Sequence, residues 1–220
     1  LIAGFPLPIL LALSLHHVKS KRFQKTVQMV TYAPHFISTV VIVGILTQFF
    51  SPRIGVVNQL RELFGFEPID FFGNPNYFWH LFVWSDVWQN IGFGCIIYLA
   101  ALSGIDPTLH EAATIDGATK FQRIRHIDIP GIVPIAVILF ILNMGNTLDI
   151  GFEKAYLMQN SLNLRTSEVI ETYVYKVGLN SQVVNFSYAA AIGFFKSVVG
   201  LVLLVLFNRL ARKVGETSLW

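Results

Sequence analysis

The stretch HEAATIDGATKFQRIRHIDIP, residues 110–130, is the most polar long segment of an otherwise apolar chain, and it lies between two runs long enough to cross a bilayer. Its first two residues begin the pattern His-Glu-x-x-His, in which two histidines one helical turn apart hold a zinc ion. The pattern stops there, because the position that must be histidine is Thr114. The segment is not a zinc-protease motif, so its polarity needs another explanation.

Composition predicts a membrane protein. Of the 220 residues, 54% are hydrophobic and only 13% are charged, whereas about a quarter are charged in soluble domains. The net charge of +3 does not indicate nucleic-acid binding, because the basic residues fall between apolar runs, where membrane topology explains them. The single cysteine, Cys95, lies in an apolar run, so this chain alone builds neither a disulfide framework nor a thiolate metal site.

Apolar runs predict five membrane spans, counted against the ~20 residues that cross a ~30 Å hydrocarbon core. The runs cover residues 1–15, 31–50, 77–102, 130–150 and 184–208. The first run reaches only about 22 Å as a helix, so we expect a span whose beginning precedes residue 1, and six spans in total. The predicted fold is an all-α integral membrane protein with a single domain, 1–220. Its outer loops are 51–76 and 151–183, and its polar loop is 104–129.

The distribution of Lys and Arg predicts the orientation. These residues concentrate after the first run, in the polar loop and in the tail, as with Lys21, Arg123 and Arg212. By the positive-inside rule, the polar loop and the C-terminus then lie in the cytoplasm.

Within the polar loop, the residues predict a helix, a turn and a second helix. Asp106 followed by Pro107 is typical of a helix start, because Asp caps free amides and proline suits the first turn. Gly117 permits a turn that other residues make only at a cost, and Pro130 opens the next span. One face of the first helix carries mostly small side chains, those of Leu109, Ala112, Ala113 and Asp116.

The spacing of these residues resembles the EAA loop of binding-protein-dependent ABC importer permeases, whose pattern is Glu-Ala-Ala, x3, Gly, x9, Ile-x-Leu-Pro. Here Glu111-Ala112-Ala113 precedes Gly117, and Ile127-x-Ile129-Pro130 follows, with Ile129 in place of Leu. The likeness covers nearly the whole chain. The segments TYAPHFIS, IIYLAALSGIDPTLHEAATIDGA, ETYVYKVGL and AAIGFFKSVVGLVLLVLFNRLARK resemble permeases of oligosaccharide and polysaccharide importers, including those for alginate and aldouronate fragments.

This resemblance implies a type I ABC importer permease in the bacterial cytoplasmic (inner) membrane. The polar loop would be a coupling segment seated on an ATPase subunit, through Glu111, Ala112, Ala113, Asp116, Gly117, Ile127 and Pro130. The implied partners are two ATPase subunits that hold ATP and Mg, a second and different permease chain, an extracytoplasmic sugar-binding protein, the lipid membrane and a carbohydrate. We expect no catalytic residue, cofactor or metal in this chain, and its sequence contains no Gly-x4-Gly-Lys-Ser/Thr.

Polar residues inside the spans predict a substrate path, because a polar group facing lipid is costly and usually turns inward. The candidates are Asp86, Trp88, Gln89, Asn90, Asn143, Asn146 and Lys196. The alternative for each amide is a hydrogen bond between helices. Lys196 and Asp86 have similar predicted depths, so we expect them close together, either as an ion pair or beside the carboxylates of an acidic sugar.

The second outer loop predicts a surface helix, in RTSEVIETYVYKVG, with Thr166 as its N-cap and Gly178 as its end. Such a helix could contact the sugar-binding protein through Glu171 and Lys176, or it could pack on the membrane domain. The residues do not decide between these two roles.

Two other functions stay open on the sequence. An ion-gradient-driven secondary transporter would make the loop match accidental. An integral membrane enzyme could use His16, His17, His35 or His110 as a metal or acid-base site, but no acidic companion recurs at ligand spacing.

Overall fold

The structure, a computed structural model, describes residues 2–181 and 183–214. These residues form helices and connecting turns without a strand, which confirms the predicted all-α class. A helix gives most backbone groups a partner inside its own segment, as the bilayer interior requires. The chain divides into two compact units, which are described separately.

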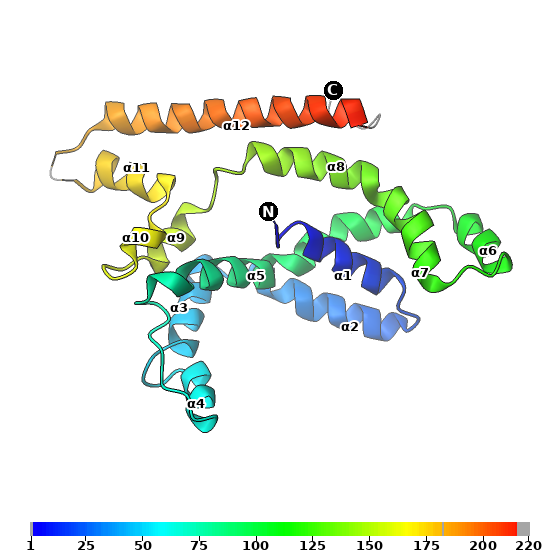
Figure 1. The fold of residues 1–220 in the computed structure, drawn as a ribbon, viewed down its shortest axis with the longest axis horizontal. Helices are drawn as coiled ribbons and strands as arrows, with labels where there is room; N and C mark the ends of the chain where they lie inside the picture. The colour runs from blue at the N-terminus through cyan, green and yellow to red at the C-terminus, as the bar shows by residue number, and fades with distance from the viewer. Residues whose placement is uncertain (1, 182, 215–220) are drawn as a thin grey trace. The chain divides into compact units, whose positions relative to one another are not determined.

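Of the described residues, the first unit comprises 2–35, 87–147 and 200–214. Its helices are α1 (Pro6–His16), α2 (Lys21–Tyr32), most of α5 (Pro75–Ser103), α6 (Pro107–Ile115), α7 (Lys120–Arg123), the π-helical η2 (Ile124–Asp128), α8 (Ile129–Gly145) and the end of α12 (Phe186–Val214) (Figure 1). Its core is apolar and is formed by Ala12, Leu13, Leu15, Cys95, Tyr98, Leu99, Leu102 and Ile132.

Glycines allow close helix contacts in the first unit. A Cβ added to Gly92 would lie 2.1 Å from the carbonyl oxygen of Thr31, so α5 and α2 meet backbone to backbone. A Cβ on Gly200 would lie 2.7 Å from the carbonyl oxygen of Gly145, where α12 meets α8. Small residues of this kind let membrane helices approach closely.

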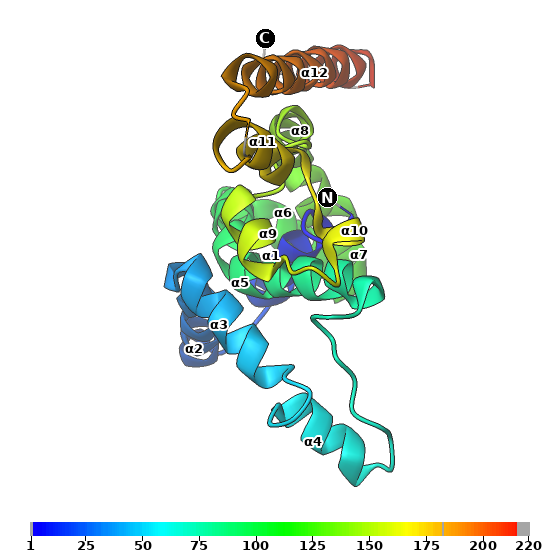
Figure 2. The same ribbon diagram turned by 90° about the vertical axis from the view of Figure 1, so that its left-hand side faces the viewer.

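The second unit comprises Phe36–Asp86 and Leu148–Val199. Its helices are α3 (Thr39–Phe49), α4 (Val56–Leu63), the beginning of α5, α9 (Phe152–Met158), α10 (Leu164–Ser167), α11 (Ile170–Leu179) and the beginning of α12 (Figure 2). The short 3-10 helix η1 (Ala33–Phe36) joins α2 to α3. The core of this unit contains Val43, Phe71, Phe78, Leu81, Phe82, Ala155, Met158 and Val169.

Buried amides hold the loops of the second unit. Asn58, 2% exposed, donates to the carbonyl oxygens of Ser51 and Ile69 and accepts from the Ile69 amide. Asn163, 1% exposed, donates to the carbonyl oxygens of Phe72 and Met158. Each amide replaces backbone hydrogen bonds that an irregular loop cannot make with itself.

Among the residues that the structure describes, two helical stretches are long and apolar enough to cross a membrane, Lys120–Gly145 and Phe186–Lys213. Two interrupted pairs meet the same test together, one joining α2 and η1 to α3 and the other joining α5 to α6. The predicted first span corresponds to the shorter apolar helix α1. The predicted second span, 31–50, is not one continuous helix, because Ser38 ends the preceding turn and caps α3 by accepting from the Val41 amide.

The second outer loop contains the predicted helix, but its first and last residues differ from those predicted. Thr166 is not its N-cap: this residue lies inside α10, where its hydroxyl donates to the Pro75 carbonyl oxygen. The following helix, α11, begins at Ile170 instead. Gly178 lies inside α11, and a Cβ there would be 2.9 Å from that of Ala189, so this glycine permits packing against α12.

Candidate functional site

The polar loop begins with a capped helix. The Asp106 carboxylate accepts a hydrogen bond from the Thr108 amide at 2.9 Å, and α6 starts at Pro107 as predicted. This hydrogen bond lowers the pKa of Asp106, because it favours the ionised carboxylate. α6 is bent by 70° from α5, so the loop leaves the direction of the span.

Gly117 ends α6 in a Schellman motif. The Ala118 amide donates to the Ala113 carbonyl oxygen at 2.8 Å, and the Gly117 amide donates to that of Thr114 at 3.1 Å. Gly117 has φ +77°, a left-handed conformation that costs glycine little. A Cβ there would meet nothing within 4 Å, so the requirement for glycine comes from its backbone conformation.

The second half of the loop starts at once. Thr119 and Gln122 form a capping box, in which the Gln122 side chain accepts from the Thr119 amide at 2.7 Å. From Lys120 the chain then runs through α7 and η2 directly into α8. The predicted separate second helix is therefore the base of the next span, and Pro130 lies one residue inside α8 without interrupting it.

The two faces of α6 differ in exposure. Glu111, Ala112 and Ile115 are exposed, and Ile115 is 86% exposed. His110 and Ala113 are partly buried. The predicted small-residue face is thus divided, with Ala112 facing outward and Ala113 turned toward the chain.

Other residues of the predicted coupling set extend this description. Asp116 and Gly117 are exposed at the end of α6, and Ile127 is partly buried in η2. Phe121, 71% exposed, adds an apolar side chain to the solvent-exposed surface of the loop. The sequence reasoning missed Ile115 and Phe121, although large apolar residues in the most polar segment of the chain could have indicated a contact surface.

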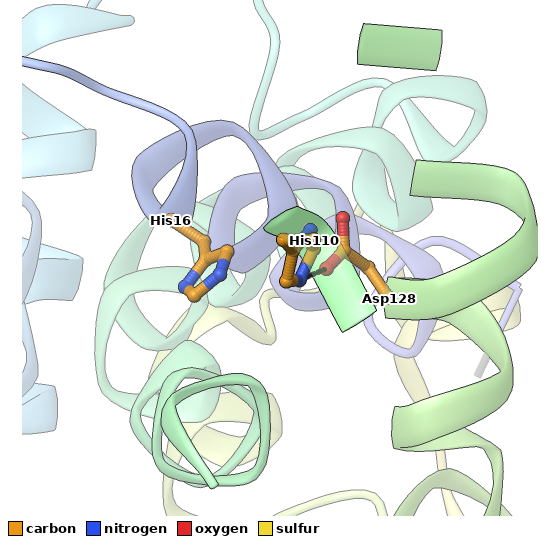
Figure 3. Close-up of side chains that lie close together, drawn as sticks. All are labelled: His16, His110 and Asp128. Carbon is orange, nitrogen blue, oxygen red and sulfur yellow. Dashed lines mark ion pairs between the residues drawn. The ribbon is translucent and has the colours of Figure 1, made fainter. Parts of the chain in front are cut away.

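A cluster of three histidines surrounds one buried carboxylate at the base of the loop. Asp128, whose side chain is 0% exposed, has Oδ2 2.6 Å from His17 Nε2 and Oδ1 3.3 Å from His110 Nε2. His16 lies beside them, at the end of α1 (Figure 3). Asp128 is the acidic companion that sequence spacing did not reveal, because the histidines of α1 lie more than a hundred residues away.

The pairing predicted for Lys196 and Asp86 is wrong. Lys196 contacts the carboxylate of Glu171, with Asp149 at 3.4 Å. Asp86 Oδ1 instead lies 3.7 Å from the amine of Lys154. Lys154 is 6% exposed, and burial lowers its pKa despite the opposing effect of Asp86.

The remaining predicted path residues belong to the first unit. Trp88 is 52% exposed. Asn90 Oδ1 lies 2.9 Å from His35 Nδ1 and accepts its hydrogen bond, so this amide bonds between helices. His35 also stacks on Phe93, with ring centroids 3.9 Å apart. Gln89 is partly buried, and Asn143 and Asn146 are exposed at the end of α8.

The residues predicted to meet a binding protein are engaged within the chain. Glu171 is largely buried against Lys196. Lys176 contacts Glu168 at 2.7 Å and keeps 32% of its side chain exposed. Lys176 is therefore the more accessible of the two.

Comparison with known proteins decides the family. Residues 4–216 match the family described as "Binding-protein-dependent transport system inner membrane component". The chain belongs to this family. This permease is accordingly a transport component of the inner membrane, as its EAA-like loop predicted.

Individual relatives agree with this assignment. The permease is 43% identical to the polygalacturonan/rhamnogalacturonan transport system permease protein YteP of Bacillus subtilis (strain 168), over 98% of this chain and 67% of that protein. It is 38% identical to protein LplB of the same organism, over 100% of this chain and 69% of the relative. Among solved structures it matches a bacterial alginate ABC transporter in complex with alginate pentasaccharide-bound periplasmic protein, with a TM-score of 0.94 and 39% identity. That match covers 98% of this chain and 74% of the other.

Proposed function

We propose that this permease is the membrane-spanning subunit of an ATP-driven importer that moves oligosaccharides or polysaccharides into the cell. The match over residues 4–216 to binding-protein-dependent transport components is the observation that carries the proposal. The relatives that are 43% and 39% identical are named for polysaccharide transport, which supports a carbohydrate substrate.

The substrate class we favour is an acidic oligosaccharide. Polygalacturonan, named for one relative, and alginate, named for a solved structure, are both polymers of uronic acids. A chain of carboxylates needs cationic or hydrogen-bonding groups along its route. The second permease half would supply part of that route, because a two-fold or pseudo-two-fold pair is needed to enclose a path.

The solvent-exposed face of α6 and the turn that follows it would bind an ATPase subunit. Ala112 lets two backbones approach, Ile115 offers an apolar contact, and Glu111 offers a carboxylate to donors on the partner. The caps at Asp106 and Gly117 fix the helix so that nucleotide-driven movement of the ATPase reaches the spans.

The rest of the assembly follows from this role. Two ATPase subunits would hold ATP and Mg, and a different permease chain would complete a heterodimer. The polar loop and the C-terminus would lie in the cytoplasm, and an extracytoplasmic binding protein would deliver the sugar at the opposite side. This chain would bind no nucleotide and would catalyse no reaction itself.

Co-purification tests the seating of α6. Ala112→Trp places a large side chain on the exposed face, so the ATPase subunits should be lost from the purified complex while membrane insertion is unchanged. Leu63→Trp is a matched control, because Leu63 is 81% exposed on α4 in an outer loop. Retention of the ATPase in both variants, with unchanged ATP hydrolysis, would contradict the proposed seating.

A further inference from the structure

We propose that His16, His110 and Asp128 bind one divalent transition metal ion, with Zn²⁺ as the preferred occupant, and that the ion fastens the coupling helix α6 to the base of the spans. The three residues come from separate segments of the first unit: the end of α1, the middle of α6 and the π-helical turn η2. Figure 3 shows their side chains gathered at one place.

The distances suit a metal centre. One ligand atom from each of the three residues lies within 4.8 Å of the others. His110 Nε2 and Asp128 Oδ1 are 3.3 Å apart, which is about the separation of two ligand atoms in a tetrahedral Zn²⁺ site with bonds of about 2.0 to 2.1 Å. A small closure of His16 toward this pair completes the set.

Two of the candidate ligand atoms make no hydrogen bond. His110 Nε2 and Asp128 Oδ1 are both buried and have no hydrogen-bond partner among the residues that the structure describes. A buried polar atom that makes no hydrogen bond is costly, because the protein interior solvates it poorly. A cation between these two atoms would satisfy both at once.

His17 holds the Asp128 carboxylate in place from the other side. Its Nε2 lies 2.6 Å from Asp128 Oδ2, the oxygen that does not face His110. Such a hydrogen bond fixes the carboxylate so that Oδ1 points into the cluster, as outer partners of metal ligands do. The π-helical turn at Ile124–Asp128 contributes too, since a π-turn changes the direction of side chains within a continuous helix and is frequent at functional sites.

The donor set selects the metal. Two imidazoles and one carboxylate suit Zn²⁺ and its neighbours in the first transition row. Mg²⁺ and Ca²⁺ prefer oxygen ligands and would be poorly held. The ion would cross-link three segments that are far apart in sequence, and metal availability would thereby affect how firmly α6 is held.

Metal binding to the purified complex tests the site. The complex of this permease with its partner subunits is stripped with a chelator and titrated with Zn²⁺, and bound metal is measured by mass spectrometry. We expect the wild-type complex to bind one more Zn²⁺ ion per copy of this chain than the His110→Gln or His16→Gln complex. Co²⁺ should give the visible absorption of a low-symmetry site in wild type and lose it in both variants.

Two further variants sharpen the result. His17→Phe should weaken Zn²⁺ binding about 10- to 100-fold without removing the equivalent, as loss of an outer partner does. His126→Gln is the matched control, because His126 belongs to η2 but bonds the Gln122 carbonyl oxygen outside the cluster; it should bind Zn²⁺ as wild type does. Zn²⁺ should also raise the unfolding temperature of wild type and not that of His16→Gln. Equal metal content in wild type, His110→Gln and His16→Gln would overturn the proposal and leave a hydrogen-bonded cluster without a metal.

Discussion

Lys196 in α12 contacts Glu171 in α11, and this contact ties together three segments of the second unit. Asp149, in the connection before α9, lies 3.4 Å from the same amine. Glu171 also accepts from the Ile150 amide at 3.4 Å, and its side chain is 13% exposed. Lys196 therefore balances a largely buried carboxylate.

Removing the lysine should mainly cost stability. Lys196→Met leaves Glu171 uncompensated, so we expect a loss of about 2 kcal/mol, between the values for exposed and buried pairs. The double variant Lys196→Met/Glu171→Met should recover most of this lost stability, as measured by thermal unfolding in detergent. Uptake of neutral and uronate oligosaccharides should fall equally in the single variant. Selective loss of uronate uptake at unchanged stability would instead assign Lys196 to the substrate.

The Asp86 and Lys154 pair should respond asymmetrically to substitution. Burial lowers the pKa of Lys154 even with Asp86 present, so the charged amine is destabilising overall. Asp86→Asn removes the compensating charge and should cost about 1 kcal/mol, since Asp86 is more than half exposed. Lys154→Met should be at least as stable as wild type at pH 7, and the double variant should match Lys154→Met.

The pH dependence of this effect has a definite sign. Below the lowered pKa, Lys154 is charged in both folded and unfolded chains, so the folded state carries the full cost of burying the charge. Between that pKa and the ordinary value of 10.5 the unfolded chain holds more protons, and wild type gains stability as pH rises. The advantage of Lys154→Met should therefore shrink as the pH approaches 10.5. A constant difference across this range would contradict the assigned cause.

Close packing at Gly92 predicts a strong substitution effect. Gly92→Ala forces a Cβ against the Thr31 carbonyl oxygen and should destabilise the first unit by about 1 to 3 kcal/mol. Gly44→Ala in α3 is the control, because a Cβ there meets nothing within 4 Å. Gly44→Ala should leave the stability unchanged or raise it slightly, since alanine favours the helical conformation more than glycine does. Equal effects of the two changes on unfolding temperature would argue against the backbone contact.

Helix α11 gives a test of the proposed binding-protein contact. A photo-crosslinker at Lys176, whose side chain is 32% exposed, should capture the binding protein during sugar delivery. The same crosslinker at Glu171 should react only within this chain, because that side chain faces Lys196. If both positions give only internal products, α11 serves packing alone.

Features determined by neighbouring residues could be predicted from the sequence. Asp106-Pro107 begins α6 and Gly117 ends it, because capping and left-handed turns depend on residues within a few positions. Helices were also predicted in the long apolar runs, and the structure has helices there, although residues 31–50 do not form one continuous helix. Gly178 misled the prediction, since a glycine that ends a helix and one that permits packing look alike in sequence.

Features determined by distant residues could not be predicted. The partner of Lys196 is Glu171, and this pairing depends on how α11 packs against α12. The prediction used the similar depths of Lys196 and Asp86 in their spans and therefore chose the wrong partner. Asp128 joins His17 across 111 positions, so no local spacing indicates the cluster. The division of α6 into an exposed face and a partly buried face likewise depends on the neighbouring helices. It places Ala112 on the exposed face and Ala113 on the partly buried one.

Uptake by reconstituted vesicles tests the central claim most directly. The complex of this permease, its partner permease, its ATPase subunits and its binding protein is placed in vesicles, and entry of a labelled oligogalacturonate or oligoalginate is measured. We predict uptake that requires ATP and Mg on the ATPase side, is unaffected by collapsing ion gradients, and is lost in Gly117→Pro. Uptake driven by an ion gradient without ATP, and unchanged in Gly117→Pro, would contradict the account.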